Sequence, residues 1–486
     1  MSFNSIQFFL FFPIVTLIYF LLPYRFRWLH LLVASCIFYM YFIPKYILIL
    51  FFTIVVDYIA GIYIEDAKGH RRKFLLSLSV IANVGVLCVF KYYNFFIGNI
   101  ETAMQSLHMS SYSFPVLKYI LPLGLSFHTF QAMSYTIEVY RGNQKAERHI
   151  GIYALYVMFY PQLVAGPIER PQNLLHQFHD EHDFVYADVL DGLKMMLWGL
   201  FKKVVIADSI GAVISPVFNN PHSFSSVSIL IAVILFPFQL YCDFAGYSDI
   251  ALGSAKVMGF KLKRNFNFPY IAQNMSDFWR RWHISLSTWL NDYLFTPLSI
   301  SFRNWGKWGI IAALNITFLI AGLWHGANWN FIVFGLLNGI ALSYDVFSRK
   351  FRKKMASAIP KAVYSSLSIV LTFLSWAIML VFFRAASVGP AMYMLKQIPM
   401  GFVEIFNHSI VNLLTFNRTI TLLQSVCILS LVVALQIAEY FQRKINLVSY
   451  LDRKPLLMRW GAYYLMIVAI ICLANAGEPT FIYFQF

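Results

Sequence analysis

The chain has 486 residues, of which 59% are hydrophobic and only 12% are charged, and its formal net charge is +16. Soluble globular proteins contain roughly a quarter charged residues, so this composition excludes an ordinary water-soluble fold. It predicts an all-α polytopic protein embedded in the lipid bilayer. In a soluble protein the positive charge would favour nucleic-acid binding, but here it indicates short basic cytoplasmic loops, and we expect no nucleic-acid partner.

About eleven segments are apolar over the roughly 20 residues that a transmembrane helix needs. They cover residues 6–22, 28–43, 46–64, 74–97, 119–140, 227–250, 309–323, 329–347, 362–383, 420–440 and 461–476. The first segment lacks the basic n-region and the cleavage site of a signal peptide, so we expect it to be a retained span. Residues 98–115 and 387–418 are more polar and are predicted to be loops.

Residues 150–218 are apolar but are interrupted by prolines and glycines, among them Pro161, Gly166 and Pro167. This pattern predicts re-entrant or interfacial helices. Together they are expected to take the chain across the membrane once. Irregular backbone at membrane depth is tolerated only when it is buried in protein or lines a cavity, which indicates a core that contains a cavity. With both termini outside, the basic loops then all lie on the cytoplasmic face, as the positive-inside rule requires.

The five cysteines are scattered and form no C-x-x-C pair, so neither a disulfide framework nor a zinc cluster is predicted. We expect the cysteines to be small core residues, and we predict no metal site. The sequence also lacks a G-x-S-x-G elbow, a P-loop, a G-x-G-x-x-G turn and an H-E-x-x-H pair. Their absence argues against a serine nucleophile, a nucleotide-binding fold and a zinc hydrolase.

Residues 323–329 (LWHGANW) place His325 in one of the most apolar parts of the chain. An ionisable side chain at membrane depth is costly and therefore marks a functional site by default. Neighbouring glycines such as Gly322 allow a tight turn and a close approach of backbones. We predict that His325 is catalytic and that Trp324 and Asn328 beside it contact substrate. A purely structural histidine is the alternative.

A second histidine, His283, lies in residues 277–293, which are predicted to form one amphipathic helix. At about 100° per residue, His283 shares the apolar face of this helix with Trp279 and Trp282. We therefore predict that His283 is a second catalytic residue and that the two tryptophans contact substrate. A hydrogen-bonded core histidine is the alternative, because buried polar groups normally find partners.

The adjacent Arg280 and Arg281 point away from this face, toward the water or the lipid phosphates. There we predict that they bind an anionic substrate, with anchoring of the helix at the membrane interface as the alternative. Asp243 lies four residues before Tyr247 and hence on the same helix face. We predict that Asp243 orients an imidazole or a substrate, although such a carboxylate more often pairs with an arginine or caps a helix. Residues 166–171 (GPIERP) predict a rigid turn with an exposed ion pair.

Several of these segments resemble the membrane-bound O-acyltransferase family. The segments are residues 166–172 (GPIERPQ), 243–270 (DFAGYSDIALGSAKVMGFKLKRNFNFPY), 278–290 (FWRRWHISLSTWL), 323–335 (LWHGANWNFIVFG) and 481–486 (FIYFQF). The branch that they resemble contains the membrane subunits of alginate, peptidoglycan and other exopolysaccharide O-acetylation, and it includes the subunit that transfers D-alanine to teichoic acid. The resemblance implies one membrane domain over residues 1–486, with a catalytic core at residues 121–342.

The resemblance also implies helices around a central funnel or tunnel that brings an activated acyl group to His325. The family's second position, here His283, is histidine in this bacterial branch and asparagine in many eukaryotic relatives, which favours a positioning role. The implied acyl donor is a thioester, on coenzyme A or an acyl carrier protein, without a permanently bound cofactor. The implied partners are an extracytoplasmic SGNH-type acetyltransferase or similar protein and a polysaccharide acceptor, at a bacterial inner or plasma membrane.

We therefore predict an O-acyltransferase that moves an acetyl group from a cytoplasmic thioester to a polysaccharide hydroxyl, with His325 as general base. D-alanyl transfer to teichoic acid is the alternative within the family. A proton-coupled transporter and a non-catalytic membrane scaffold are the alternatives of another class. The transporter is less favoured because the sequence contains no paired repeat halves.

Overall fold

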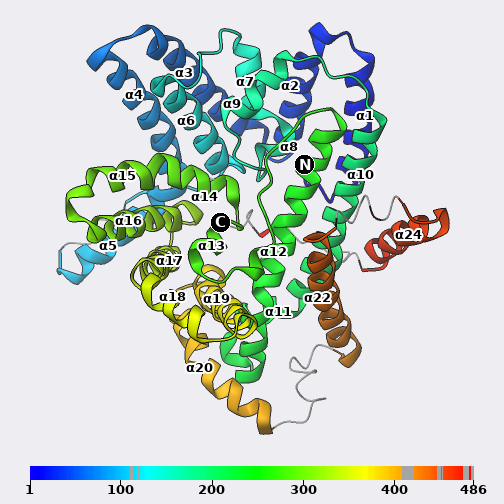
Figure 1. Cartoon of the computed structure of the whole chain (residues 1–486). Helices are drawn as coiled ribbons and strands as arrows, with labels where there is room; N and C mark the ends of the chain where they lie inside the picture. Colours follow the sequence, from blue (N-terminus) through cyan, green and yellow to red (C-terminus); the bar gives the residue numbers. More distant parts are fainter. Residues whose placement is uncertain are drawn as a thin grey trace. The chain divides into compact units, whose positions relative to one another are not determined.

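The computed structural model describes residues 1–109, 114–118, 121–407, 421–445, 450, 453–473 and 481–482. Within these ranges the chain forms helices joined by loops and turns, without a strand (Figure 1). Eight described helices are long and apolar enough to cross a membrane. They are Pro44–Asp66, Gly69–Ser106, Ser226–Val257, Lys307–His325, Trp329–Phe347, Lys361–Arg384, Leu422–Gln442 and Leu456–Leu473. The chain is therefore the multi-pass helical membrane protein that its composition predicts.

Each of these eight helices coincides with one of the predicted spans. The other three predicted spans coincide with shorter helices of 16 or 17 residues, which are α1 (Ile6–Leu21), α2 (Tyr24–Met40) and α6 (Leu125–Arg141). In residues 150–218 the chain forms short helices and then a long helical run. The predicted interruption of this region is confirmed, and the re-entrant or interfacial position of its short helices stays a prediction.

The chain divides into two compact units. The first comprises Met1–Met196 and Ser248–Lys263, and the second comprises Leu197–Tyr247 and Arg264–Phe486. The first unit contains α1, α2, α3 (Ile47–Asp66), α4 (Gly69–Leu87), α5 (Tyr93–Ser106), α6, α7 (Ile150–Met158), α8 (Tyr160–Leu163) and α9 (Pro171–Leu174). Two helices, α10 (Tyr186–Leu200) and α12 (Ser226–Val257), contribute residues to both units.

The second unit contains the remaining helices. They are α11 (Asp208–Asn219), α13 (Met275–Trp279), α14 (Ile284–Leu290), α15 (Thr296–Ser301), α16 (Lys307–His325), α17 (Trp329–Phe347), α18 (Arg349–Ala358), α19 (Lys361–Arg384), α20 (Val388–Asn407), α22 (Leu422–Gln442) and α24 (Leu456–Leu473). A π-helical segment, Phe201–Ala207, joins α10 to α11 without a break.

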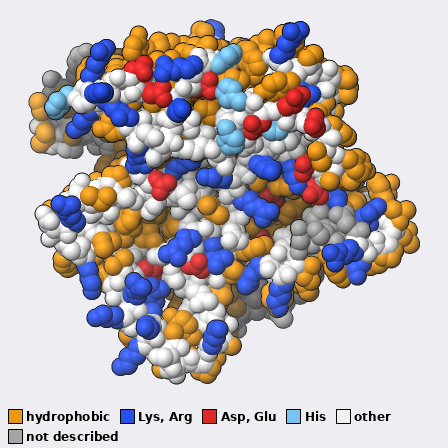
Figure 2. All heavy atoms as spheres, turned by 45° about the horizontal axis from the view of Figure 1, so that its top comes forward, with side chains coloured by type: hydrophobic (Ala, Val, Ile, Leu, Met, Phe, Trp, Pro, Cys, Tyr) orange, Lys and Arg blue, Asp and Glu red, His pale blue; other side chains and the backbone are white. Residues whose placement is uncertain are grey.

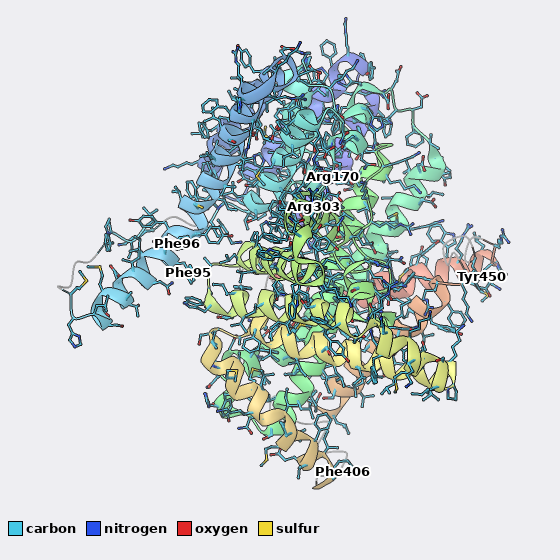
Figure 3. All side chains as sticks on the ribbon, turned by 60° about the vertical axis from the view of Figure 1, so that its left-hand side comes forward. Phe95, Phe96, Arg170, Arg303, Phe406 and Tyr450 are labelled. Atoms are coloured by element: carbon cyan, nitrogen blue, oxygen red, sulfur yellow. The ribbon has the colours of Figure 1, made fainter. Side chains whose placement is uncertain are left out.

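Large apolar side chains are exposed on many of these helices. Phe96 on α5 and Phe406 on α20 have exposed fractions of 54% and 88%, and both are labelled in Figure 3. Figure 2 shows hydrophobic side chains interleaved with Lys and Arg side chains on the face drawn there. Apolar exposure on this scale suits contact with lipid, because a water-soluble monomer rarely leaves large apolar patches uncovered.

Basic loops that the sequence predicts to share a face lie together within the first unit. Arg72 donates to the backbone carbonyl of Val139 at 2.9 Å, which links the first turn of α4 to the end of α6. Arg148 pairs with Glu65 at 2.5 Å, which links the loop before α7 to the end of α3. These contacts bring the basic segments 68–73 and 141–148 near one another, and their predicted cytoplasmic location stays a prediction.

Two of the predicted loops are in part helical. α5 extends into the predicted loop 98–115, and α20 fills most of the predicted loop 387–418, whose residues 408–418 lie outside the described part of the chain. α20 packs on α12 through Gly401, where an added Cβ would lie 2.6 Å from the carbonyl oxygen of Ser226. The prediction is wrong for α20 because tertiary packing overrides the weak helical signal of a segment rich in glycine and proline.

The predicted location of the cysteines is correct only in part. Cys242 is buried, but Cys88, Cys427 and Cys472 are exposed. The exposed three lie on or within helices that are candidate membrane spans. A thiol behaves as a small hydrophobic group, so a lipid-facing position suits it as well as a core position does.

Two spans of the second unit, α16 and α17, pack closely through glycines. An added Cβ on Gly322 would lie 2.2 Å from the carbonyl oxygen of Phe331, and one on Gly335 would lie 2.3 Å from that of Phe318. Small residues let helix backbones approach in membrane proteins, where van der Waals packing drives helix association. The predicted close approach at Gly322 is therefore confirmed, and it fixes the last turn of α16, which ends at His325.

Replacing Gly322 with alanine is expected to lower the free energy of unfolding by about 1–3 kcal/mol, because the new methyl group forces the two helices apart. Gly85→Ala in α4 is the matched control, since nothing lies within 4 Å of its added Cβ. Thermal unfolding of the purified protein in detergent compares the two variants. An equal melting temperature for Gly322→Ala and the wild-type protein would contradict the close packing.

Candidate active site

His325 is the last residue of α16 and is buried, with 7% of its surface exposed. Aromatic side chains enclose it. The ring centroids of Trp324, Phe383 and Phe334 lie 4.9, 5.2 and 5.9 Å from the centroid of its imidazole. Gly326 then continues in an extended conformation, and α17 follows. The helix of the predicted span 309–323 thus extends to His325 and ends there.

His283 lies where the predicted helix over residues 277–293 is broken. α13 ends at Trp279 and α14 begins at Ile284, and His283 between them has a φ of +44°. The prediction of one continuous helix is therefore wrong. A residue whose backbone lies in the left-handed region cannot continue a right-handed helix. Apolar periodicity alone does not reveal such a residue.

Hydrogen bonds from residues 265 and 267 hold this turn in place. The N–H of Ile284 donates to the carbonyl of Asn265 at 2.9 Å, and the hydroxyl of Ser285 donates to the Asn265 side chain at 2.6 Å. The N–H of Asn267 donates to the carbonyl of Arg281 at 2.9 Å. The strained backbone at the second histidine is thus fixed on both sides, an arrangement that is common at functional sites.

The helix break and the helix end bring the two predicted catalytic histidines to one place. His283 is fully buried, and its ring centroid lies 4.6 Å from that of Phe244 and 6.3 Å from that of Trp324. Burial lowers the pKa of His283 well below its usual value, and the charge that His325 carries when it is protonated lowers this pKa further. His283 is therefore an uncharged imidazole at neutral pH, next to His325.

Only one of the predicted tryptophans contacts both histidine rings. Trp324, which is 4% exposed, lies against His325 and faces His283. Trp279 and Trp282 pack in the core of the second unit, with ring centroids 6.0 and 5.2 Å from that of Trp376. Packing alone accounts for their burial, so the prediction that these two tryptophans contact substrate stays a prediction.

The polar residues that the sequence assigns to substrate binding differ in their surroundings. Arg280 is exposed, whereas Nε of Arg281 pairs with Asp277 at 2.9 Å, one helical turn away. Asn328 is half-buried and precedes the first turn of α17. The ion pair gives Arg281 a structural role, while Arg280 and Asn328 are accessible to a ligand.

Asp243 belongs to a buried group of three charged side chains. Nζ of Lys203 lies 2.6 Å from Asp243 and 2.7 Å from Asp208, and all three side chains are at most 7% exposed. Lys203 lies in the π-helical segment Phe201–Ala207, and residues five apart are neighbours in a π-helix. The alternative given above was pairing with an arginine, and the partner is a lysine instead. A substrate role for Asp243 stays a prediction.

Asp243 also holds the C-terminal residues Phe481 and Ile482. The backbone N–H of Ile482 donates to the Asp243 carboxylate at 2.9 Å. The ring of Phe481 stacks on Tyr247, with centroids 4.7 Å apart, and lies 6.0 Å from Phe244, the same ring that contacts the second histidine. The rest of the C-terminal motif lies outside the described part of the chain.

The residues of this site that the sequence prediction omits include Lys203, Phe244 and Phe383. A signal for Lys203 was present, because a lysine inside an apolar stretch requires a counter-charge or a special environment. No comparable signal marks the two phenylalanines, since 48 phenylalanines are spread through the chain. Their role is visible only once the fold places their rings against the imidazoles.

The predicted turn at residues 166–171 lies in the first unit and is buried, so the prediction of an exposed ion pair is wrong. Glu169 is fully buried, and Arg170 is 9% exposed. The Glu169 carboxylate accepts the backbone N–H of Lys263 and the side-chain amide of Asn173, both at 2.5 Å. Charged residues in turns are normally solvated, but hydrogen bonds of this kind compensate for burial.

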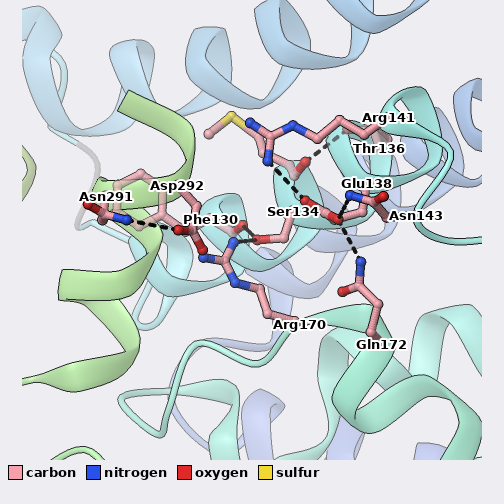
Figure 4. A network of polar contacts seen from close by, with 11 residues as sticks. Phe130, Ser134, Thr136, Glu138, Arg141, Asn143, Arg170, Gln172, Asn291 and Asp292 are labelled. Atoms are coloured by element: carbon pink, nitrogen blue, oxygen red, sulfur yellow. Dashed lines mark hydrogen bonds and ion pairs between the residues drawn. The ribbon is translucent and has the colours of Figure 1, made fainter. Parts of the chain in front are cut away.

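Figure 4 shows the polar contacts that tie this turn to α6. Glu138 of α6 accepts hydrogen bonds from Gln172 at 2.6 Å and from Asn143 at 2.9 Å. Arg170 donates to the hydroxyl of Ser134, also on α6, at 3.4 Å. The turn is therefore held rigidly against the helix, in agreement with the predicted rigid turn.

Burial raises the pKa of Glu169 from 4.5 to about 7, although its bonds to Lys263 and Asn173 favour the charged form. Because the pKa is higher in the folded than in the unfolded state, stability falls as the pH rises from about 4.5 through about 7. We expect the melting temperature of the wild-type protein to fall relative to that of Glu169→Gln over this pH range. A difference that is independent of pH would contradict the raised pKa.

Comparison with known proteins identifies the family to which this chain belongs. The membrane-bound O-acyltransferase family model matches residues 149–386, a range that contains both histidines. The chain is 37% identical to the peptidoglycan O-acetyltransferase of Helicobacter pylori. The alignment of 406 residues covers 76% of this chain and 73% of that protein. The chain is also 36% identical to the probable alginate O-acetylase AlgI of Pseudomonas aeruginosa. That alignment of 392 residues covers 80% of this chain and 72% of AlgI.

A more distant relative is the teichoic acid D-alanyltransferase of Bacillus subtilis, which is 31% identical over 265 residues, 52% of this chain and 65% of that protein. The two closer matches extend over most of both chains and so reach well beyond isolated motifs. This chain belongs to the membrane-bound O-acyltransferase family and is an O-acyltransferase.

Proposed function

We propose that this protein transfers an acetyl group for the O-acylation of a cell-surface or secreted polysaccharide, in the inner or plasma membrane of a bacterium. The group comes from a cytoplasmic thioester on coenzyme A or an acyl carrier protein. The observation that carries the proposal is the meeting of His283 and His325 in a buried, aromatic site of a family member. An extracytoplasmic SGNH-type acetyltransferase or a similar protein completes the delivery.

In the proposed step an uncharged ring nitrogen of His325 accepts the proton of the acceptor hydroxyl while the hydroxyl oxygen attacks the thioester carbon. A carbon–oxygen bond forms and the carbon–sulfur bond breaks. The proton then passes from the imidazolium to the leaving thiolate, which restores the neutral imidazole. The aromatic rings of Trp324, Phe334 and Phe383 support this role because they keep water from the thioester.

His283 is proposed to position the donor or to stabilise the oxyanion that forms on the thioester oxygen. Its uncharged imidazole can donate one N–H, and a preorganised donor in a dry site stabilises developing negative charge strongly. The fixed turn around His283 supports this assignment, since a positioning group has to stay in place during the reaction. Arg280, which is exposed, is proposed to attract the phosphates of the donor or the acidic surface of a carrier protein.

The names of the relatives favour acetyl as the transferred group. The peptidoglycan O-acetyltransferase and the alginate O-acetylase each match over at least 76% of this chain. The D-alanyltransferase matches over 52% of it. We therefore infer acetyl transfer to a polysaccharide hydroxyl, with D-alanyl transfer to teichoic acid as the second candidate.

Chemical analysis of a strain that lacks this gene tests the acyl group and the acceptor. Mild alkali releases ester-linked groups from the extracted polysaccharides, and chromatography identifies them. We expect acetate to be absent from the deletion strain and to return when the full chain is supplied. Loss of D-alanine from teichoic acid would instead assign the second candidate. Unchanged O-acylation of all polymers would overturn the proposal.

A further inference from the structure

The helix α18, which joins the spans α17 and α19, is short and strongly basic. Its ten residues include five cations and no acidic side chain. Arg349, Lys350, Lys353 and Lys354 are exposed, and at about 100° per residue they share one side of the helix. None of these four forms an ion pair with another described residue. Their charge is therefore available to an external anion.

The position of α18 in the chain places it at the surface of the bilayer. α17 and α19 are both candidate membrane spans, so α18 lies where the chain leaves the bilayer and enters it again. Figure 1 shows α17, α18 and α19 close to one another. An amphipathic helix at such a site turns its apolar side toward lipid tails and its basic side toward headgroups.

A groove of about 300 Å³ opens beside α18. Much of its lining is apolar and comes from Phe351 and Met355 of α18, Ala341 of α17, and Leu367 and Leu371 of α19. Phe351 and Leu371 are 59% and 55% exposed, so the groove is open to its surroundings. An open apolar groove between two spans is suited to a hydrocarbon chain.

The charged residues of the groove lining neutralise each other. Nη2 of Arg352 lies 3.4 Å from the Asp345 carboxylate. The other oxygen of that carboxylate accepts the backbone N–H and the hydroxyl of Ser276, at 2.8 and 2.9 Å. The groove interior therefore carries little net charge, whereas α18, which lines the groove through Phe351, Arg352 and Met355, carries four exposed cations elsewhere on its surface. This division matches the apolar chain and the anionic headgroup of a charged lipid.

We propose that α18 and this groove form a binding site for an anionic phospholipid of the bilayer. The headgroup phosphate lies among Arg349, Lys350, Lys353 and Lys354, and one acyl chain enters the groove. Basic clusters next to a membrane span attract anionic lipids, which favours this occupant over a zwitterionic lipid. The apolar lining favours a lipid over free phosphate. The site does not depend on the catalytic role of His325.

Native mass spectrometry of the purified full-length protein tests the headgroup site, with phosphatidylglycerol and phosphatidylcholine as competing probes. We expect the wild-type protein to retain phosphatidylglycerol in preference, and the K350A/K353A/K354A variant to lose this preference about tenfold or more. The K68A/R71A/K73A variant is the matched control, because it removes three exposed cations at the junction of two other spans. Equal phosphatidylglycerol retention by the wild-type protein and the α18 variant would overturn the site.

A second pair of variants tests the groove without changing any charge. Leu371→Trp fills the groove and is expected to reduce phosphatidylglycerol retention. Val370→Trp, at the adjacent exposed position outside the groove lining, is expected to leave it unchanged. Unchanged retention in Leu371→Trp would overturn the acyl-chain site. Full displacement of the lipid by glycerol phosphate, which has a headgroup but no chain, would overturn it as well.

Discussion

Replacing His325 with alanine is expected to reduce polysaccharide O-acylation about 10²- to 10⁴-fold, because that is the contribution of a positioned general base. The side chain is 7% exposed and lies at the end of α16, so its loss leaves the packing of α16 on α17 through Gly322 and Gly335 in place. Ester-linked acyl groups, measured per amount of membrane-inserted protein, give the result.

The matched control is His128→Ala, a histidine of similar burial in the first unit that hydrogen-bonds to Thr53 at 2.6 Å. It removes a buried imidazole outside the candidate site, so acylation per amount of protein is expected to stay near the wild-type value. Acylation at the wild-type level by the His325→Ala variant would contradict the assignment of His325 as the general base. An equal loss of acylation in both variants would show that both imidazoles act through folding and that His325 has no separate catalytic role.

Replacing Lys203 with methionine is expected to lower the free energy of unfolding by about 3–5 kcal/mol, because it leaves buried carboxylates without their counter-charge. Lys203 lies within 2.7 Å of both Asp208 and Asp243, and the three side chains are almost fully enclosed. The variant also disturbs the site, since Asp243 holds the backbone of Ile482. Thermal unfolding in detergent measures the loss.

The triple variant K203M/D208N/D243N separates charge from packing. It removes all three charges at once, so no unpaired ion is left inside the protein, and it is expected to recover much of the stability that Lys203→Met loses. A melting temperature of Lys203→Met equal to that of the wild-type protein would contradict a buried ion pair. A triple variant less stable than Lys203→Met would show that the charges favour the fold together.

The sequence was sufficient to predict the spans because long apolar stretches have few alternatives to a membrane helix. All eight long apolar helices in the described part of the chain coincide with predicted spans. The position of His325 at a helix end follows from the same pattern together with the glycines around it. α20 was missed because its helical state depends on packing against α12, a contact between distant residues that local sequence does not report.

The site itself was predictable in its chemistry but only partly in its geometry. Two histidines in apolar surroundings marked the chemistry, because buried ionisable groups need a reason. The left-handed residue His283 was not predictable, since its conformation is stabilised by Asn265 and Asn267 from a separate segment. Asp243 was singled out, but its partner Lys203 lies 40 residues earlier and is brought to it only by the fold.

Thioester cleavage by the purified full-length protein in proteoliposomes tests the central claim most directly, with labelled acetyl-coenzyme A as donor and with the extracytoplasmic partner acetyltransferase and a polysaccharide acceptor added. The wild-type protein is expected to transfer label to the polysaccharide. His325→Ala is expected to bind the donor with similar affinity but to transfer label at least about 100-fold more slowly. Transfer by His325→Ala at the wild-type rate would contradict the account, because the imidazole of His325 would then not be the proton acceptor.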